Sequence, residues 1–194
     1  MLLSYGHAKL EWLGVEYILS PSFANIAKLG SPSEIVDDFK SFITTTSPVY
    51  KFMIALSVLR ACCDKDLPEG FAGRIVFTSG KFKYVQPAHG IDVFSDIITL
   101  AEHCLIHGVC GKVKKTDDDD NSKGKPIKEF DAYEFMEMAR VHLGMSRGEA
   151  ENLTMTEFIR MMRAKFPEPI DETKASRSEE KDMLAWYFDK NKAH

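Results

Sequence analysis

Four side chains between residues 103 and 110 have the types and spacing of metal ligands. His103 and His107 are four positions apart, and Cys104 and Cys110 lie beside them. Imidazole and thiolate groups are good zinc ligands, and histidines one helical turn apart can share an ion. The helical pattern, however, places Cys104 in the centre of an apolar face and His103 on the polar face, with Cys110 beyond the helix end. Buried reduced thiols and a solvated histidine are therefore the favoured interpretation, and metal binding by His103 and His107 stays open.

Other kinds of reaction centre leave little trace in the sequence. Cys62, Cys63 and Ser79 could supply a nucleophile, but no nucleophile elbow or family-specific cysteine motif surrounds them. The glycines near Gly70 lack the ending of a phosphate-binding loop. The run Asp117–Asp120 lacks the alternating ligands of a calcium loop. We therefore expect no enzymatic activity, cofactor or metal, and a small metal- or thiol-dependent enzyme is the last-ranked alternative.

The composition points to an ordinary protein of the cytoplasm. The 194 residues are 44% hydrophobic and 28% charged, as in a soluble globular protein, and the net charge of −4 argues against nucleic acid as a partner. Glu11 and Glu16 interrupt the apolar start, so we expect no signal peptide. No stretch approaches the ~20 apolar residues that span a membrane. In the cytoplasm the four cysteines would stay reduced.

The pattern of apolar residues predicts an α+β fold that is predominantly α-helical. Alternation over residues 8–19 and 74–85 predicts two β-hairpins, the second turning at Ser79-Gly80. Ser31 begins a capping box for a helix that runs to about Phe42, and an amphipathic helix after Gly90 should end at Gly108. A helix that begins at Ser47-Pro48 is expected to bury the stripe Val49, Phe52, Met53, Leu56, Leu59 and Cys63.

A charged segment divides the chain into parts. Residues 112–128 have few large apolar side chains, which is typical of a disordered linker because little offsets the chain entropy. We expect an N-terminal α+β domain over residues 1–111 and a three-helix module over residues 129–167. A polar tail over residues 168–194 should end in a short amphipathic helix.

Capping signals define the helices of the module. Its first helix ends at Gly144, and the pairs Ser146/Glu149 and Thr154/Glu157 form capping boxes for the next two. Its many methionines suit contact with an irregular partner surface. The aromatic cluster in the tail suits an interface, and docking onto the chain's own body fits it equally well. The residues expected to bind a partner are Tyr133, Phe135, Met136, Phe158 and Met162 in the module and Trp186, Tyr187 and Phe188 in the tail.

Two stretches carry a family resemblance. The run LGMSRGEAENLTMTEFIRMM, within Tyr133–Ala164, resembles the helical module of tail assembly chaperones of long-tailed bacteriophages. The shared pattern is a helix that ends in Leu-Gly-hydrophobic, a short acidic helix, and a Met-Thr start to a final helix. The stretch SPSFANIAKLGSPSEIV also resembles phage proteins of poorly defined role encoded near tail genes. The first likeness is carried by Leu143, Gly144, Met145, Glu149, Leu153, Thr154, Phe158 and Ile159.

The resemblance implies a non-enzymatic role in virion morphogenesis. It implies a chaperone that binds the tape measure protein and recruits tail tube subunits, acts in the host cytoplasm and is absent from the mature virion. Family members are often also made in a longer form by ribosomal frameshifting. The chain departs from small chaperones of this class in its long N-terminal domain. A structural tail or head–tail joining component is therefore the alternative; homo-oligomers fit both roles, and neither needs nucleic acid or a membrane.

Overall fold

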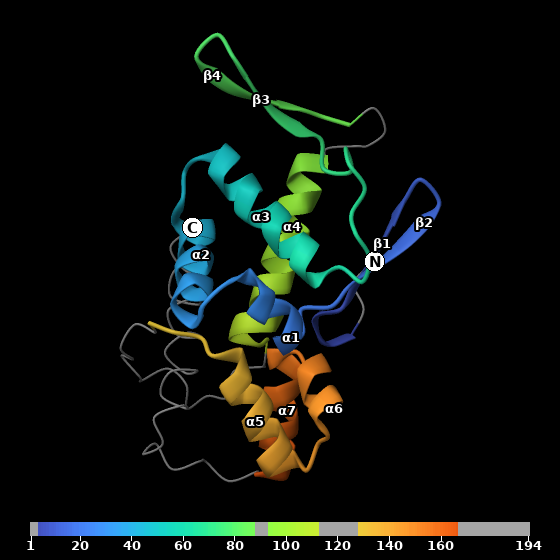
Figure 1. Cartoon of the computed structure of the whole chain (residues 1–194), viewed down its shortest axis with the longest axis vertical. Helices are drawn as coiled ribbons and strands as arrows, with labels where there is room; N and C mark the ends of the chain where they lie inside the picture. Colours follow the sequence, from blue (N-terminus) through green and yellow to red (C-terminus); the bar gives the residue numbers. More distant parts are fainter. Residues whose placement is uncertain (1–3, 88–92, 113–127, 167–194) are drawn as a thin grey trace.

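The computed structural model describes residues 4–87, 93–112 and 128–166. The predicted fold class, α+β and predominantly helical, is confirmed (Figure 1). No helix in these ranges is both long and apolar enough to cross a membrane. The elements are η1 (Ser4–Gly6), β1 (Ala8–Trp12), β2 (Val15–Leu19), α1 (Phe23–Ile26), η2 (Ala27–Leu29), α2 (Pro32–Thr44), α3 (Pro48–Cys62), β3 (Arg74–Thr78), β4 (Lys81–Val85), α4 (Val93–Leu105), η3 (Ile106–Cys110), α5 (Ala132–Leu143), α6 (Arg147–Asn152) and α7 (Met155–Lys165).

The strands form the two predicted hairpins. β1 pairs with β2 and β3 pairs with β4, both antiparallel, in two separate sheets. The turn residues Leu13 and Gly14 have φ values of 49° and 76°, and Ser79 and Gly80 have 53° and 76°. Two central residues with positive φ make the turn whose twist matches the twist of the flanking strands. The local sequence is therefore sufficient to close each hairpin.

The capping boxes are also present as predicted. The backbone N–H of Ser31 donates to Glu34 Oε2 at 2.8 Å, and that of Ser146 donates to Glu149 Oε2 at 2.8 Å. These contacts satisfy backbone donors that the first helical turn leaves without partners. They fix where α2 and α6 begin, whereas α2 runs two residues past the expected end at Phe42.

The helix that begins with α4 does not end at Gly108, as the sequence suggested. It continues through the π-helical turn η3 to Cys110, which is buried. Gly108 serves close packing instead: a Cβ there would lie 2.7 Å from Ile26 Cδ1 and 3.0 Å from Pro21 Cβ. The chain leaves the helix at Gly111, whose φ of 73° favours glycine.

The buried face of α3 also differs from the predicted stripe. Met53 is 59% exposed and Val49, Leu56 and Cys63 are only half-buried. Most positions of this helix are apolar, so several overlapping stripes fit the sequence. The structure selects a wide face because α3 packs against α4 and also against α1 and α2. The residues buried on it are Phe52, Ile54, Ala55, Val58, Leu59 and Cys62.

The two parts on either side of residues 113–127 share one hydrophobic core. The Phe23 N–H donates to the Leu153 carbonyl at 2.8 Å, and the Phe130 N–H donates to the Pro32 carbonyl at 2.9 Å. Phe23 and Phe130 are each at most 1% exposed. The helices α5–α7 therefore rest directly on α1 and the start of α2 in the structure. The predicted linker itself lies mostly outside the described residues.

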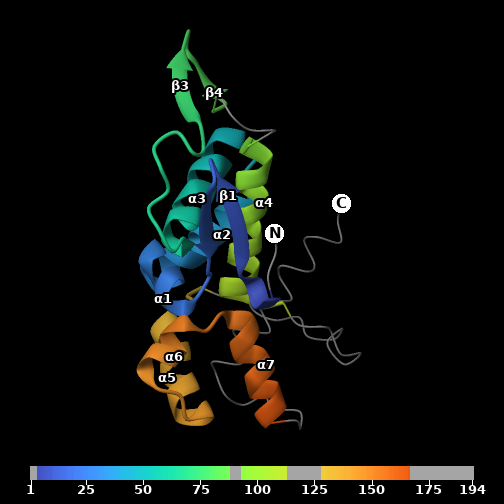
Figure 2. The same cartoon turned by 90° about the vertical axis from the view of Figure 1, so that its right-hand side faces the viewer.

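The elements are stacked along one long axis. The hairpin β3–β4 projects at one end, α2–α4 and the hairpin β1–β2 form the middle, and α5–α7 form the other end (Figures 1 and 2). The first and last of these layers are therefore remote from each other, although they belong to one chain.

Candidate functional site

Four of the predicted partner-binding residues lie inside the molecule. Phe135, Met136, Phe158 and Met162 are between 2% and 8% exposed. The ring centroid of Phe23 is 5.7 Å from that of Phe135 and 5.8 Å from that of Phe158. These side chains hold α5 and α7 against α1, so in this conformation they present little surface to a partner.

The remaining predicted contact residues divide into two groups. Tyr133 is on the outer side of α5 and is 65% exposed, so its ring is free to contact another protein. Trp186, Tyr187 and Phe188 lie outside the described residues. The acidic run Asp117–Asp120 lies outside them as well.

His103, which the sequence placed in solvent, is half-buried beside the buried His107. His107 is 8% exposed and its Nδ1 lies 2.8 Å from Thr156 Oγ1. The His103 and His107 rings are 4.4 Å apart, and His103 Nε2 is buried without a hydrogen-bond partner. The interpretation of a solvated His103 is therefore wrong. Because Thr156 belongs to α7, its contact with His107 joins η3 to the helical module.

Burial lowers the pKa of both of these histidines. Desolvation first, and then the charges of His103, Lys112 and His7, lower the pKa of His107 to about 4. Desolvation is also the largest cause of the lowered pKa of His103. A neutral imidazole that bridges to a hydroxyl group satisfies buried polar atoms, which explains the contact with Thr156 without a catalytic role.

Cys104 and Cys110 are buried thiols whose pKa is raised. A side-chain hydrogen bond with Cys62 and desolvation raise the pKa of Cys104, and desolvation raises the pKa of Cys110. A protonated thiol is a poor nucleophile and a poor metal ligand. In the described ranges, no group of three or more His, Cys, Asp or Glu side chains is placed to hold a metal ion.

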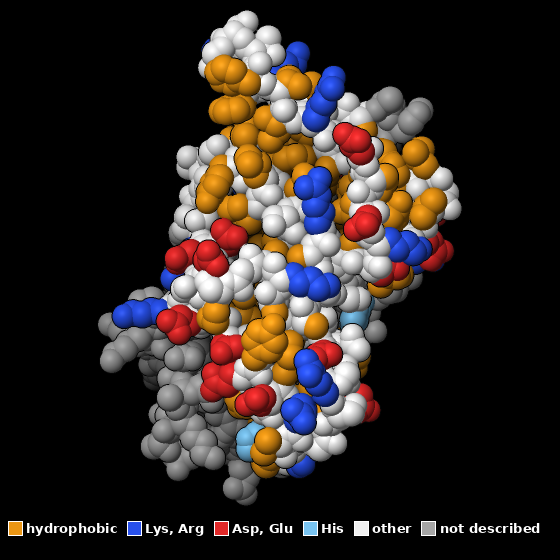
Figure 3. Space-filling model, viewed as in Figure 1, with side chains coloured by type: hydrophobic (Ala, Val, Ile, Leu, Met, Phe, Trp, Pro, Cys, Tyr) orange, Lys and Arg blue, Asp and Glu red, His pale blue; other side chains and the backbone are white. Residues whose placement is uncertain are grey.

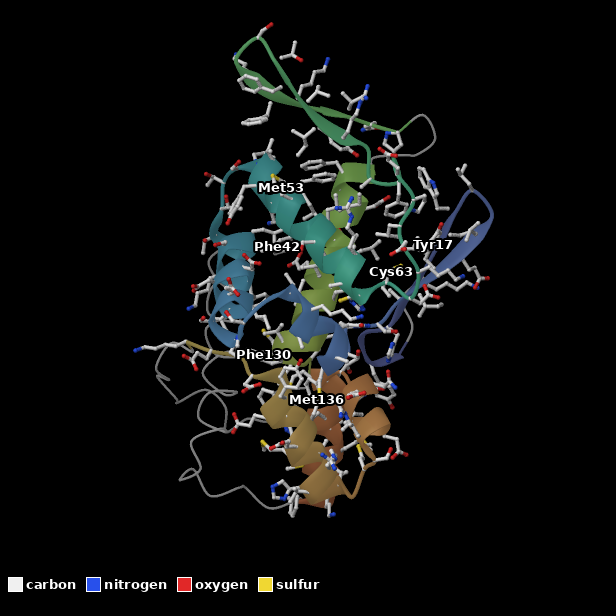
Figure 4. All side chains as sticks on the ribbon, viewed as in Figure 1. Tyr17, Phe42, Met53, Cys63, Phe130 and Met136 are labelled. Atoms are coloured by element: carbon white, nitrogen blue, oxygen red, sulfur yellow. The ribbon has the colours of Figure 1, made fainter. Side chains whose placement is uncertain are left out.

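The hairpin β3–β4 presents the most prominent exposed aromatic surface of the described chain. Phe77 and Phe82 pair across the strands, are 66% and 64% exposed, and have ring centroids 5.1 Å apart. We call these two residues the aromatic tip. Met53 lies at the end of α3 that faces the hairpin (Figure 4). Hydrophobic side chains gather between the hairpin and this end of the body (Figure 3).

The root of the same hairpin is fixed by Tyr84. Its ring centroid is 5.1 Å from that of Phe52 and 5.0 Å from that of Phe94, and its hydroxyl donates to the Ala72 carbonyl at 2.8 Å. Because Tyr84 and Phe82 are two residues apart on one strand, they share a face. The body therefore supports the root and leaves the tip of that face uncovered.

The sequence carries a signal for this surface. Alternation over residues 74–85 puts four large apolar side chains on one face, and a two-stranded hairpin has little core of its own to cover them. Other exposed apolar residues are more isolated, such as Leu13 (71%) at the other hairpin turn and Val141 (78%) on α5. Single residues of this kind are common on protein surfaces.

Comparison with known proteins gives one match. A model described as "Family of unknown function (DUF6246)" matches residues 42–183. The chain belongs to this family. The DUF6246 match spans 142 of the 194 residues, starts near the end of α2 and includes the hairpin β3–β4 and all three module helices. Neither a curated protein nor a solved structure matches the chain.

Proposed function

We propose that this protein is a non-enzymatic tail assembly chaperone of a long-tailed bacteriophage. It binds the tape measure protein and recruits tail tube subunits in the host cytoplasm, and it leaves before the virion is complete. The sequence resemblance over Tyr133–Ala164 supplies the class. The aromatic tip supplies the surface that such a role requires.

The exposed tip is the observation that carries this proposal. A helical client with uncovered apolar surface needs temporary cover, and aromatic side chains bury a large area at a low cost in side-chain entropy. Phe77 and Phe82 are held on a projecting hairpin, with Met53 beneath them. A projecting apolar surface can contact an extended client without the client entering a cleft. Many copies along one client would bind with avidity.

The methionines of the helical module suggested that it binds the partner, but in this proposal the module has a structural role. Most of its large apolar side chains pack against the body, so it forms a platform rather than a second adhesive surface. Tyr133 and Val141 are exceptions, because both side chains are exposed on α5, and Tyr133 is the aromatic one. We assign client contact to the aromatic tip and leave Tyr133 as a secondary contact.

Co-expression with the tape measure protein tests the proposal. We expect the wild-type chain to keep the client soluble and to co-purify with it. The double variant Phe77→Ser/Phe82→Ser should bind about 30-fold more weakly, since loss of a central interface aromatic costs ~2 kcal/mol or more. Leu13→Asn is the matched control, because it removes an exposed apolar side chain from the turn of the other hairpin.

Two results would contradict this function. If the wild-type chain neither solubilises the tape measure protein nor co-purifies with it, the chaperone proposal fails. If mass spectrometry of purified particles finds the chain at the abundance of a tail component, a structural role replaces it. If the double variant and Leu13→Asn bind the client with equal affinity, the client does not bind at the aromatic tip.

A further inference from the structure

One face of the hairpin β3–β4 is apolar from root to tip. The pairs Ile75/Tyr84 and Phe77/Phe82 lie directly opposite each other in the register, two residues apart, and so share that face. Ile75 and Tyr84 pack against the core, whereas Phe77 and Phe82 do not. A partner segment on the tip would therefore continue an apolar surface that already begins in the body.

The other face of the hairpin is basic. Arg74, Lys81 and Lys83 are exposed there, one residue out of step with the apolar face, and no acidic residue occurs between positions 74 and 85. In the described chain β3 and β4 pair only with each other. A segment that suits this hairpin thus covers the apolar face with large apolar side chains and has acidic side chains beside them that can reach the basic ones around the strand edges.

The chain itself contains a segment of this composition. Residues 183–188 read MLAWYF, and residues 179–182 before them, Glu-Glu-Lys-Asp, carry three negative charges and one positive charge, whereas Lys190 and Lys192 follow Asp189 on the other side. We call residues 183–188 the tail segment; it lies outside the described residues. Its aromatic side chains match the tip, and the acidic residues before it can reach the long basic side chains around the edges of the strands.

Geometry decides which copy supplies the tail segment. α4 with η3 and α7 follow each other along the long axis, away from the hairpin (Figures 1 and 2). At 1.5 Å per residue these helices account for ~40 Å, and the hairpin strands extend ~17 Å further. The 16 residues 167–182 span at most ~55 Å when fully extended. A chain's own tail would have to be drawn almost straight, whereas the tail of a second copy has no such restraint.

We propose that the tail segment of one copy docks on the aromatic tip of another. The contact is heterologous, because the two surfaces are at different places on the chain. It goes beyond client binding, since it needs only copies of this protein. In the setting of the proposed function, the client would displace a neighbour's tail from the same tip.

Complementation between two full-length variants tests the contact. The hairpin variant is Phe77→Ser/Phe82→Ser, and the tail variant is Trp186→Ser/Tyr187→Ser. Sedimentation velocity without any client should show that the wild-type chain and Leu13→Asn self-associate. Each double variant should associate about 30-fold more weakly. An equimolar mixture of the two variants should restore a heterodimer, because one partner keeps the tip and the other keeps the tail.

Several outcomes would overturn this inference. A wild-type chain that stays monomeric does so. Association that survives in both double variants also does so, as does a mixture that forms no heterodimer. None of these results depends on the tape measure protein. Loss of client binding with self-association intact would contradict the proposed function alone.

Discussion

The two hairpins have the same strand lengths and turn type but different relations to the body. β1–β2 is tied to the end of α3: the Ser20 N–H donates to the Cys62 carbonyl at 2.8 Å, and the Asp64 N–H donates to the Ile18 carbonyl at 2.9 Å. Leu19 is fully buried. By contrast, no backbone hydrogen bond joins β3 or β4 to another element in the described chain. Side chains at its root, with Tyr84 at the centre, hold β3–β4 instead.

This difference indicates that β1–β2 stabilises the fold and that β3–β4 presents a surface for binding. A hairpin held by backbone hydrogen bonds and buried side chains contributes to the stability of the core. A hairpin that is held only at its root can expose large aromatic side chains at its tip. Exposed aromatic side chains add little to folding stability, so their presence there favours a role in binding. We therefore expect substitutions in β1–β2 to change the free energy of unfolding and substitutions at the tip of β3–β4 to change association.

The largest expected effect on stability is at Leu19. Leu19→Ala should lower the free energy of unfolding by about 2–5 kcal/mol, because it leaves a cavity at a fully buried position. Urea denaturation followed by circular dichroism measures the change. A loss below ~1 kcal/mol would show that β1–β2 is not part of the core and would remove the contrast between the hairpins.

Acid should weaken the region around the start of β1 through His107. The pKa of His107 is about 4 in the folded protein and 6.5 for an ordinary histidine, so the unfolded chain takes up the proton first as the pH falls. Stability is therefore complete above pH 6.5 and is lost as the pH falls toward 4, by up to about 3 kcal/mol. The lowered pKa of His103 acts in the same direction.

His107→Gln isolates this contribution. We expect the variant to lose less stability than the wild type between pH 7 and pH 4.5, since Gln retains a polar group near Thr156 and carries no titrating proton. Urea denaturation at both pH values measures the difference. Parallel pH profiles for the two proteins would show that His107 is not kept neutral by folding.

A smaller effect is expected at the root of β3–β4. Tyr84→Phe removes the hydrogen bond to the Ala72 carbonyl but keeps the ring that packs on Phe52 and Phe94. We expect a loss of about 1 kcal/mol in the free energy of unfolding, as for a typical hydrogen bond. A much larger loss would mean that β3–β4 is integrated into the core as firmly as β1–β2.

Local signals in the sequence were sufficient for most element boundaries. Ser146 with Glu149 fixes the start of α6, and Ser79-Gly80 fixes a hairpin turn, because these interactions involve neighbours in the chain. Contacts between distant residues were not readable in the same way. Gly108 packs against Ile26, and His107 meets Thr156, which is 49 residues away. The burial of Phe135 and Phe158 against Phe23 has the same origin, so the sequence identified these aromatic residues but not their packing partners.

The smallest expected effect on stability is at the aromatic tip. Phe77→Ser should change the free energy of unfolding by less than about 0.5 kcal/mol, because most of the side chain is already in water. The substitution also removes the ring contact with Phe82, but this contact is exposed to solvent and contributes little to the free energy of unfolding. Urea denaturation of the variant beside Leu19→Ala compares the two hairpins directly. A loss near that of Leu19→Ala would mean that the tip stabilises the fold, and the tip could then no longer be explained as a surface kept for binding.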